Sequence, residues 1–154
     1  MELGSIEREI YVDASREVVF EVVSSPEHVS RWWSDEAHYQ PSPGSQGEIV
    51  FRAKDGLGET SWQFAVVDVD PPELFSFRWT HPAGEQAVSG NSLLVTFTLT
   101  PSGSGTLLKM TESGFREMGW ELAKLEQQYQ AHVSGWDMYV PRIAPYAASL
   151  GVKS

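Results

Sequence analysis

The pattern of hydrophobic and polar positions changes its period along the 154-residue chain. Apolar residues alternate with polar ones over residues 6–12, and two short segments up to residue 33 have helical spacing. The period returns to two from Gly47, and from Leu122 to Leu150 apolar residues recur at every third or fourth position. The pattern therefore predicts one strand, two short helices, a run of strands and one long final helix.

Turn signals divide the middle of the chain into segments. The predicted strands cover residues 48–54, 60–70, 73–81, 92–100 and 105–113, and residues 34–47 are predicted to form a loop. Short turns such as Asp70-Pro71-Pro72-Glu73 join consecutive strands, so the sheet is predicted to be antiparallel.

The predicted fold class is α+β. A curved antiparallel sheet of six strands carries two short helices after its first strand, and the long C-terminal helix packs on its concave face. Pro141 and Pro145 lie inside the last helical pattern, and each removes a backbone donor. We therefore expect a kink or a tightened turn in this helix.

Aromatic side chains occupy alternate positions of the predicted strands, and the final helix adds Trp136 to them. Such residues either fill a core or line a cavity for an apolar ligand, and the pattern leaves both interpretations open. The alternation on the strand of residues 92–100 predicts that Phe97 faces Trp136 across the interior. The aromatic positions of the strands are Trp62, Phe64, Phe75, Phe77, Trp79 and Phe97.

Two charged residues interrupt the apolar faces of the first and last strands. Glu112 continues the face of Met110, and Arg8 lies on the face of Ile6 and Ile10. An antiparallel pairing that sets Ile10 near Met110 sets Arg8 near Glu112. Because a charge on an inner face must be paired or hydrated, we predict an Arg8–Glu112 ion pair, and we favour it over a polar anchor for a ligand.

The histidines give no metal motif. The chain contains His28, His38, His81 and His132, and no two of them have the i, i+4 spacing of a helical metal site. His81 continues the inner face of Trp79, so it is predicted to lie either at a pocket mouth or at the rim of the sheet. Phosphate-loop and nucleophile-elbow motifs are also missing from the sequence. We therefore predict neither a metal ion nor a cofactor, and we assign no catalytic residue.

The composition limits the classes of partner that the protein is expected to bind. The formal charge is −10, with 11 Lys and Arg against 21 Asp and Glu, so we expect no nucleic-acid binding. The chain contains no cysteine, and no apolar run reaches the roughly 18 residues of a membrane span. We therefore expect a cytoplasmic protein with no membrane span, organised as one domain over residues 1–154, and a monomer or weak homodimer.

Several local motifs follow one another in an order that is more specific than any of them alone. The chain resembles the START-like (helix-grip, SRPBCC) superfamily, and within it the heat-shock-protein-90 ATPase activator homologue family. The matching motifs are Ile10-Tyr11-Val12-Asp13-Ala14-Ser15, Pro26-Glu27-His28-Val29, Trp32-Trp33, Asp70-Pro71-Pro72, Phe77-Arg78-Trp79, Val95-Thr96-Phe97, Ser113-Gly114-Phe115 and Gly135-Trp136.

The resemblance implies a six-stranded sheet wrapped around the C-terminal helix, and it leaves three functions open. The superfamily includes lipid carriers, hormone receptors and aromatase/cyclase enzymes, and the family includes a co-chaperone domain. We favour binding of a small apolar or amphipathic ligand between sheet and helix. The alternatives are a cyclase- or hydrolase-type enzyme that uses Glu112 or His81 in the same cavity, and a module for chaperone contact.

The chaperone contact is the least favoured, because the chain starts at the first predicted strand and shows no preceding chaperone-binding domain. The residues predicted to bind a ligand are Trp33, Phe51, Trp62, Phe64, Phe77, Trp79, His81, Phe97, Met110, Glu112 and Trp136.

Overall fold

The structure is a computed structural model that describes residues 4–53 and 58–151. It has an α+β fold in which one antiparallel sheet packs against three α-helices, as predicted, and a 3-10 turn precedes the last of them. The elements are β1 (Ser5–Val12), α1 (Arg16–Ser24), α2 (Pro26–Trp32), β2 (Glu36–His38), β3 (Gln46–Arg52), β4 (Glu59–Asp70), β5 (Leu74–Trp79), β6 (Leu93–Ser102), β7 (Gly105–Ser113), η1 (Arg116–Met118) and α3 (Leu122–Gly151).

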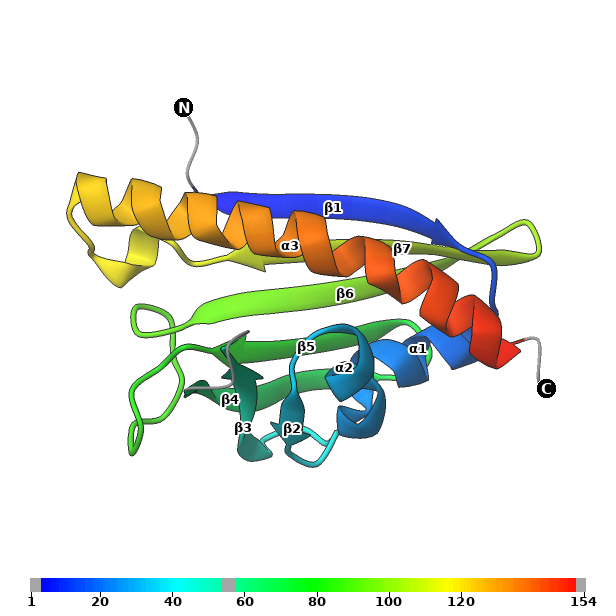
Figure 1. The fold of residues 1–154 in the computed structure, drawn as a ribbon, viewed down its shortest axis with the longest axis horizontal. Coiled ribbons are helices and arrows are strands. Elements are labelled where there is room, and N and C mark those ends of the chain that lie inside the picture. The colour runs from blue at the N-terminus through cyan, green and yellow to red at the C-terminus, as the bar shows by residue number, and fades with distance from the viewer. Residues whose placement is uncertain (1–3, 54–57, 152–154) are drawn as a thin grey trace.

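The sheet order is β1-β7-β6-β5-β4-β3-β2, and every neighbouring pair is antiparallel. Figure 1 shows α3 running along the sheet near β1 and β7, while α1 and α2 lie beside it in front of the other half. The side chain of Ser15 caps α1 by accepting from the Val18 N–H, and Pro26 opens α2 at a position where no backbone donor is needed.

The sheet has seven strands, so the prediction of six was wrong. The additional strand, β2, lies within residues 34–47, which were predicted to be a loop. Three residues are too few to establish a period of two, and the polar composition around them indicated a loop. Gly47 permits the pairing, since a Cβ there would overlap the carbonyl of His38. Residue 54, the last of the strand predicted over 48–54, is outside the described residues.

The predicted register of β1 against β7 was wrong by two residues. Ile10 pairs with Leu108, and Arg8 pairs with Met110. The predicted ion pair between Arg8 and Glu112 is therefore not formed, and Arg8 pairs with Asp137 instead. Arg8 reaches over the sheet face to α3, where its Nε lies 2.6 Å from Oδ1 of Asp137.

The final helix is continuous through both of its prolines. Figure 1 shows α3 bending over its C-terminal half, where Pro141 and Pro145 lie. The two prolines are exposed, so the side chains of the apolar stripe still face the sheet. The stripe buries Trp136, Val140, Ile143 and Ala147.

The prediction that Trp136 and Phe97 face one another needs correction. Both side chains are buried inside, but two indoles of the α2 end lie between them. Trp136 stacks on Trp33 with ring centres 5.2 Å apart, and Trp33 stacks on Trp32 at 5.9 Å. Trp32 then meets Phe97 edge-on at 6.1 Å. The distance between the sheet and α3 is thus larger than two rings in direct contact would span.

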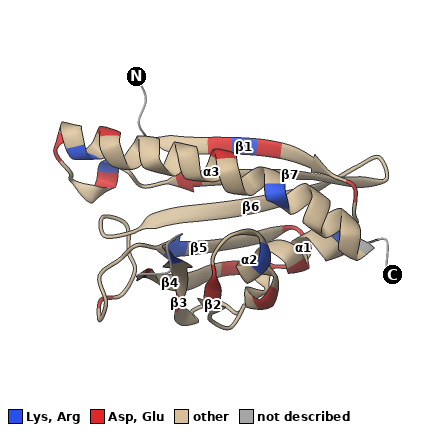
Figure 2. Ribbon diagram, viewed as in Figure 1, with Lys and Arg blue, Asp and Glu red and all other residues tan. Residues whose placement is uncertain are grey.

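Charged residues occur on most strands of the sheet, including Arg78 of β5 and Glu112 of β7. Figure 2 shows them on β1, on β2, on the short helices and toward the start of α3, whereas β6 carries none. Among the described residues, no helix is long and apolar enough to span a membrane.

Candidate functional site

A cleft of about 240 Å³ lies between the sheet and α3, and most of its wall is aromatic. We call it the indole cleft. Rings converge on it from the residue that follows α2 and from β3, β4, β5 and α3, namely Trp33, Phe51, Trp62, Trp79, Trp136 and Tyr139. Gln128, Ala131, His132 and Gly135 of α3 complete the lining. The cleft therefore offers flat apolar surfaces with a few polar groups at one side, which is typical of small-molecule sites.

Trp33 is the central ring of this wall. It follows α2 directly and packs against Trp79 at 5.0 Å, Phe77 at 5.6 Å and Phe51 at 5.8 Å between ring centres. Only 7% of its surface is exposed. The end of α2 is held in place because the neighbouring Trp32 donates its indole N–H to the Val22 carbonyl of α1 at 2.8 Å. The Trp33 side of the cleft wall is thus held in place by α1 and α2.

Glu112 of β7 is fully buried behind the cleft wall. Its Oε2 accepts the indole N–H of Trp79 at 2.7 Å, and its Oε1 accepts that of Trp136 at 2.8 Å. Oε1 also lies 2.8 Å from Nδ1 of His132. A buried carboxylate needs such partners, and three charge-assisted contacts supply them. Glu112 therefore joins β5, β7 and α3, and it fixes the planes of two indoles that line the cleft.

His132 is the polar side chain that this arrangement presents to the cleft. A carboxylate only accepts, so the contact with Glu112 places a proton on Nδ1 and leaves Nε2 on the other edge of the ring. The ring packs between Trp79 and Phe115, with centres 5.4 Å away from each. His132 is therefore held in one orientation, and its Nε2 makes no hydrogen bond to a described residue.

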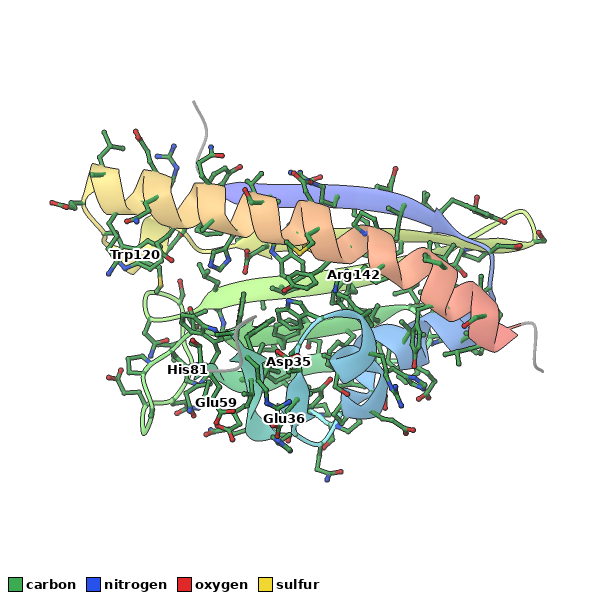
Figure 3. All side chains as sticks on the ribbon, in the orientation of Figure 1. Asp35, Glu36, Glu59, His81, Trp120 and Arg142 are labelled. Atoms are coloured by element: carbon green, nitrogen blue, oxygen red, sulfur yellow. The ribbon has the colours of Figure 1, made fainter. Side chains whose placement is uncertain are left out.

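A second hollow of about 460 Å³ adjoins the indole cleft. We call it the polar chamber. The two hollows share Trp62, Gln128 and His132 as lining residues, so they lie side by side. The chamber lies between the start of α3 and the segment that joins β5 to β6. Figure 3 shows Trp120 beneath the first turn of α3 on the side of this segment.

Comparison with known proteins gives the family. The model of the Activator of Hsp90 ATPase homolog 1-like protein family matches residues 13–148. The chain belongs to this family. No curated protein matched the sequence.

Solved structures similar to this family member share its fold at low identity. A protein from Mesorhizobium loti is 22% identical, with a TM-score of 0.69 over 92% of this chain and 94% of that chain. A protein from Nitrosomonas europaea is 10% identical, with a TM-score of 0.78 over 96% of each chain. An AHSA1-like protein from Aeromonas hydrophila is 18% identical, with a TM-score of 0.68 over 96% of this chain and 94% of that chain.

The residues predicted from the sequence to bind a ligand fall into four groups in this structure. Five of them line the indole cleft: Trp33, Phe51, Trp62, Trp79 and Trp136. Four are buried in the core without lining either hollow: Phe64, Phe77, Phe97 and Met110. Glu112 lies behind the wall and reaches the cleft only through the side chains that it binds.

His81 forms the fourth group. Its side chain is 4% exposed and lines neither hollow. His81 follows β5 and is labelled in Figure 3. Burial lowers the pKa of the His81 imidazole, and Glu85 opposes this effect. Its Nδ1 has no partner among the described residues. In this structure it is therefore a buried side chain beside the site.

Sequence reasoning missed His132. The available signal was its spacing, because His132 precedes Trp136 by one helical turn and so shares its face of α3. Tyr139 and Gln128 were also not predicted. Within the described residues, no group of three His, Cys, Asp or Glu is placed to hold a metal ion.

Proposed function

We propose that the protein reversibly binds a small, flat, largely apolar molecule in the indole cleft, with His132 as its polar contact. The observation that carries the proposal is the set of six aromatic side chains that face one hollow of about 240 Å³. Aromatic faces favour offset or edge-on contact with another ring, so a ligand with an aromatic group gains more than burial alone.

The polar contact adds a hydrogen bond to this apolar surface. Nε2 of His132 can accept from a ligand hydroxyl, since Glu112 occupies Nδ1. A phenol of two fused rings has both features, and 2-naphthol is a suitable probe. Its methyl ether, 2-methoxynaphthalene, keeps the rings and lacks the donor.

Gly135 provides a direct test, because it lines the cleft and a Cβ added there would meet open space. Gly135→Leu fills the cleft without removing any wall residue, and replacing a helical glycine does not weaken the helix. Calorimetric titration with 2-naphthol should therefore show binding to the wild type and at least a tenfold weaker Kd for the variant. Unchanged binding by Gly135→Leu would contradict the proposal, and so would no binding by the wild type.

Ser134→Leu is the matched control. Ser134 is the preceding residue of α3 and is exposed, so the same side chain is added outside the cleft. This variant should bind 2-naphthol as the wild type does. In the wild type, 2-methoxynaphthalene should bind more weakly than 2-naphthol, and this difference should vanish in His132→Leu.

The pairing of His132 with Glu112 favours acid–base catalysis as a second candidate function. A histidine whose Nδ1 is held by a buried carboxylate is oriented to take a proton through Nε2. The ring opening of 5-nitrobenzisoxazole tests this. The base removes the ring C–H proton, the C–H electrons form the nitrile, and the N–O bond breaks to give a phenolate.

The wild type should accelerate this reaction more than Gly135→Leu, whose cleft is filled. His132→Gln should lower the rate to that of the filled variant. If His132→Gln reacts as fast as the wild type, the base is another group and the second candidate function fails.

A further inference from the structure

We infer that the natural ligand carries an anionic end, such as a carboxylate, which lies in the polar chamber near Lys124 while its apolar end fills the indole cleft. The inference rests on the proposed function and specifies the ligand class. The two hollows adjoin at Trp62, Gln128 and His132, which line both, so one elongated molecule that passes these side chains would reach from one hollow to the other.

The charge of the chamber is the first observation. Among the described residues that line it, Lys124 and His132 are the ionisable ones, and no carboxylate belongs to the lining. This is notable in a chain with a formal charge of −10. Lys124 forms no ion pair with a described residue, and its ammonium lies 5.2 Å from the centre of the Trp120 ring. A cation held over an indole and not neutralised by a carboxylate suits an anionic group.

The spacing along α3 is the second observation. Lys124, Gln128, His132 and Trp136 follow one another at intervals of four, so they lie on one face of the helix. Gln128 makes no hydrogen bond to a described residue and lines both hollows. A cation, an amide, an imidazole and an indole thus form a track of decreasing polarity. From Lys124 to His132 it extends about 12 Å along the helix axis.

The opposite wall of the chamber supplies the third observation. Thr80, at the end of β5, has a φ of 72°, a conformation that is unfavourable for a β-branched residue. Its Oγ1 is buried and has no hydrogen-bond partner among the described residues. Backbone strain of this kind concentrates at ligand sites, and Thr80 belongs to the lining of the chamber.

The test uses 2-naphthylacetic, 2-naphthylbutanoic and 2-naphthylhexanoic acids, each beside its primary amide. The ring reports on the indole cleft, and the acid-to-amide ratio of Kd reports on the chamber. The wild type should prefer the longer acids over their amides by about fivefold at low salt, as expected for a partly exposed charged contact. The preference should be smallest for the shortest acid, which cannot reach Lys124 from the cleft.

Lys124→Met removes the charge and keeps most of the apolar stem. It should abolish the preference for acids and leave the affinity for amides unchanged, whereas Lys124→Arg should retain the preference. Lys109→Met is the control of equal net charge, because Lys109 pairs with Glu7 on the other face of the sheet at 3.2 Å. It should leave the preference intact.

The outcomes separate the two proposals. If amides and acids bind equally to the wild type and Lys124→Met changes neither, the anionic ligand class is overturned while cleft binding stands. If Lys109→Met reduces the preference as much as Lys124→Met does, the effect is one of overall charge and the inference fails. If no naphthyl compound binds, both proposals fail.

Discussion

Replacing Glu112 by Gln tests whether the buried carboxylate holds the cleft wall together. Gln has the same shape but only one acceptor oxygen. In the wild type Oε1 accepts from Trp136 and His132, and Oε2 accepts from Trp79. In either orientation of the amide, the NH₂ group faces one indole N–H, so one buried indole donor loses its acceptor.

The magnitude follows from that count. A buried donor left without a partner costs about 1–3 kcal/mol. The loss of charge-assisted bonds adds to this cost, and relief from burying a charge opposes it. We therefore expect Glu112→Gln to lower the free energy of unfolding by about 1–3 kcal/mol, which for a domain of this length corresponds to a Tm lower by roughly 3–10 °C.

Urea unfolding followed by far-UV circular dichroism measures this change independently of the indoles. Combining Glu112→Gln with Trp79→Phe removes the donor that the amide cannot satisfy. Trp79→Phe should therefore cost less in the Glu112→Gln background than in the wild type, with a coupling of about 1 kcal/mol or more. Additive effects, or an unchanged urea midpoint for Glu112→Gln, would refute the role assigned to the carboxylate.

Three further predictions concern other parts of the molecule. Arg8→Met and Asp137→Leu should show a coupling of about 0.2–1 kcal/mol in a urea double-mutant cycle, because both partners are partly exposed, and a coupling above about 2 kcal/mol would contradict this. Burial lowers the pKa of His81, so the unfolded chain takes up a proton near the ordinary pKa of about 6.5 while the folded chain resists it. Stability should thus fall between pH 7.5 and 5.5, and less steeply in His81→Leu; equal slopes of Tm would disprove this. Trp33→Ala should cost about 3–5 kcal/mol by urea unfolding, since Trp33 is surrounded by rings, and a loss below about 1 kcal/mol would argue against tight packing.

The element order could be predicted because each element has a periodic pattern and turn residues at its ends. The register of β1 against β7 could not. An inward-facing pattern fixes which residues share a face, and a shift by two residues preserves it. Ile10 opposite Met110 and Ile10 opposite Leu108 are therefore equally compatible with the alternation, and only the second occurs. The erroneous register placed Arg8 beside Glu112, whereas Arg8 pairs with Asp137 in the structure.

The candidate site was predictable on the side of the sheet and less so on the helix. Alternation identifies Trp62 and Trp79 as residues of one face, but it does not tell which rings fill the core and which border a hollow. That depends on the distance between α3 and the sheet, where Trp32 and Trp33 lie between the two layers. His132 escaped prediction because its role depends on Glu112, a residue 20 positions away in the sequence.

The three-residue strand β2 also bears on how the protein avoids aggregation. Without it, β3 would be the outermost strand, and its run Ile49-Val50-Phe51 would expose an unpaired backbone beside apolar side chains, which is a template for amyloid-like pairing between molecules. A strand as short as β2 offers little such template. Because Gly47 lets β2 approach, a larger residue at this position would first reduce solubility rather than abolish the fold.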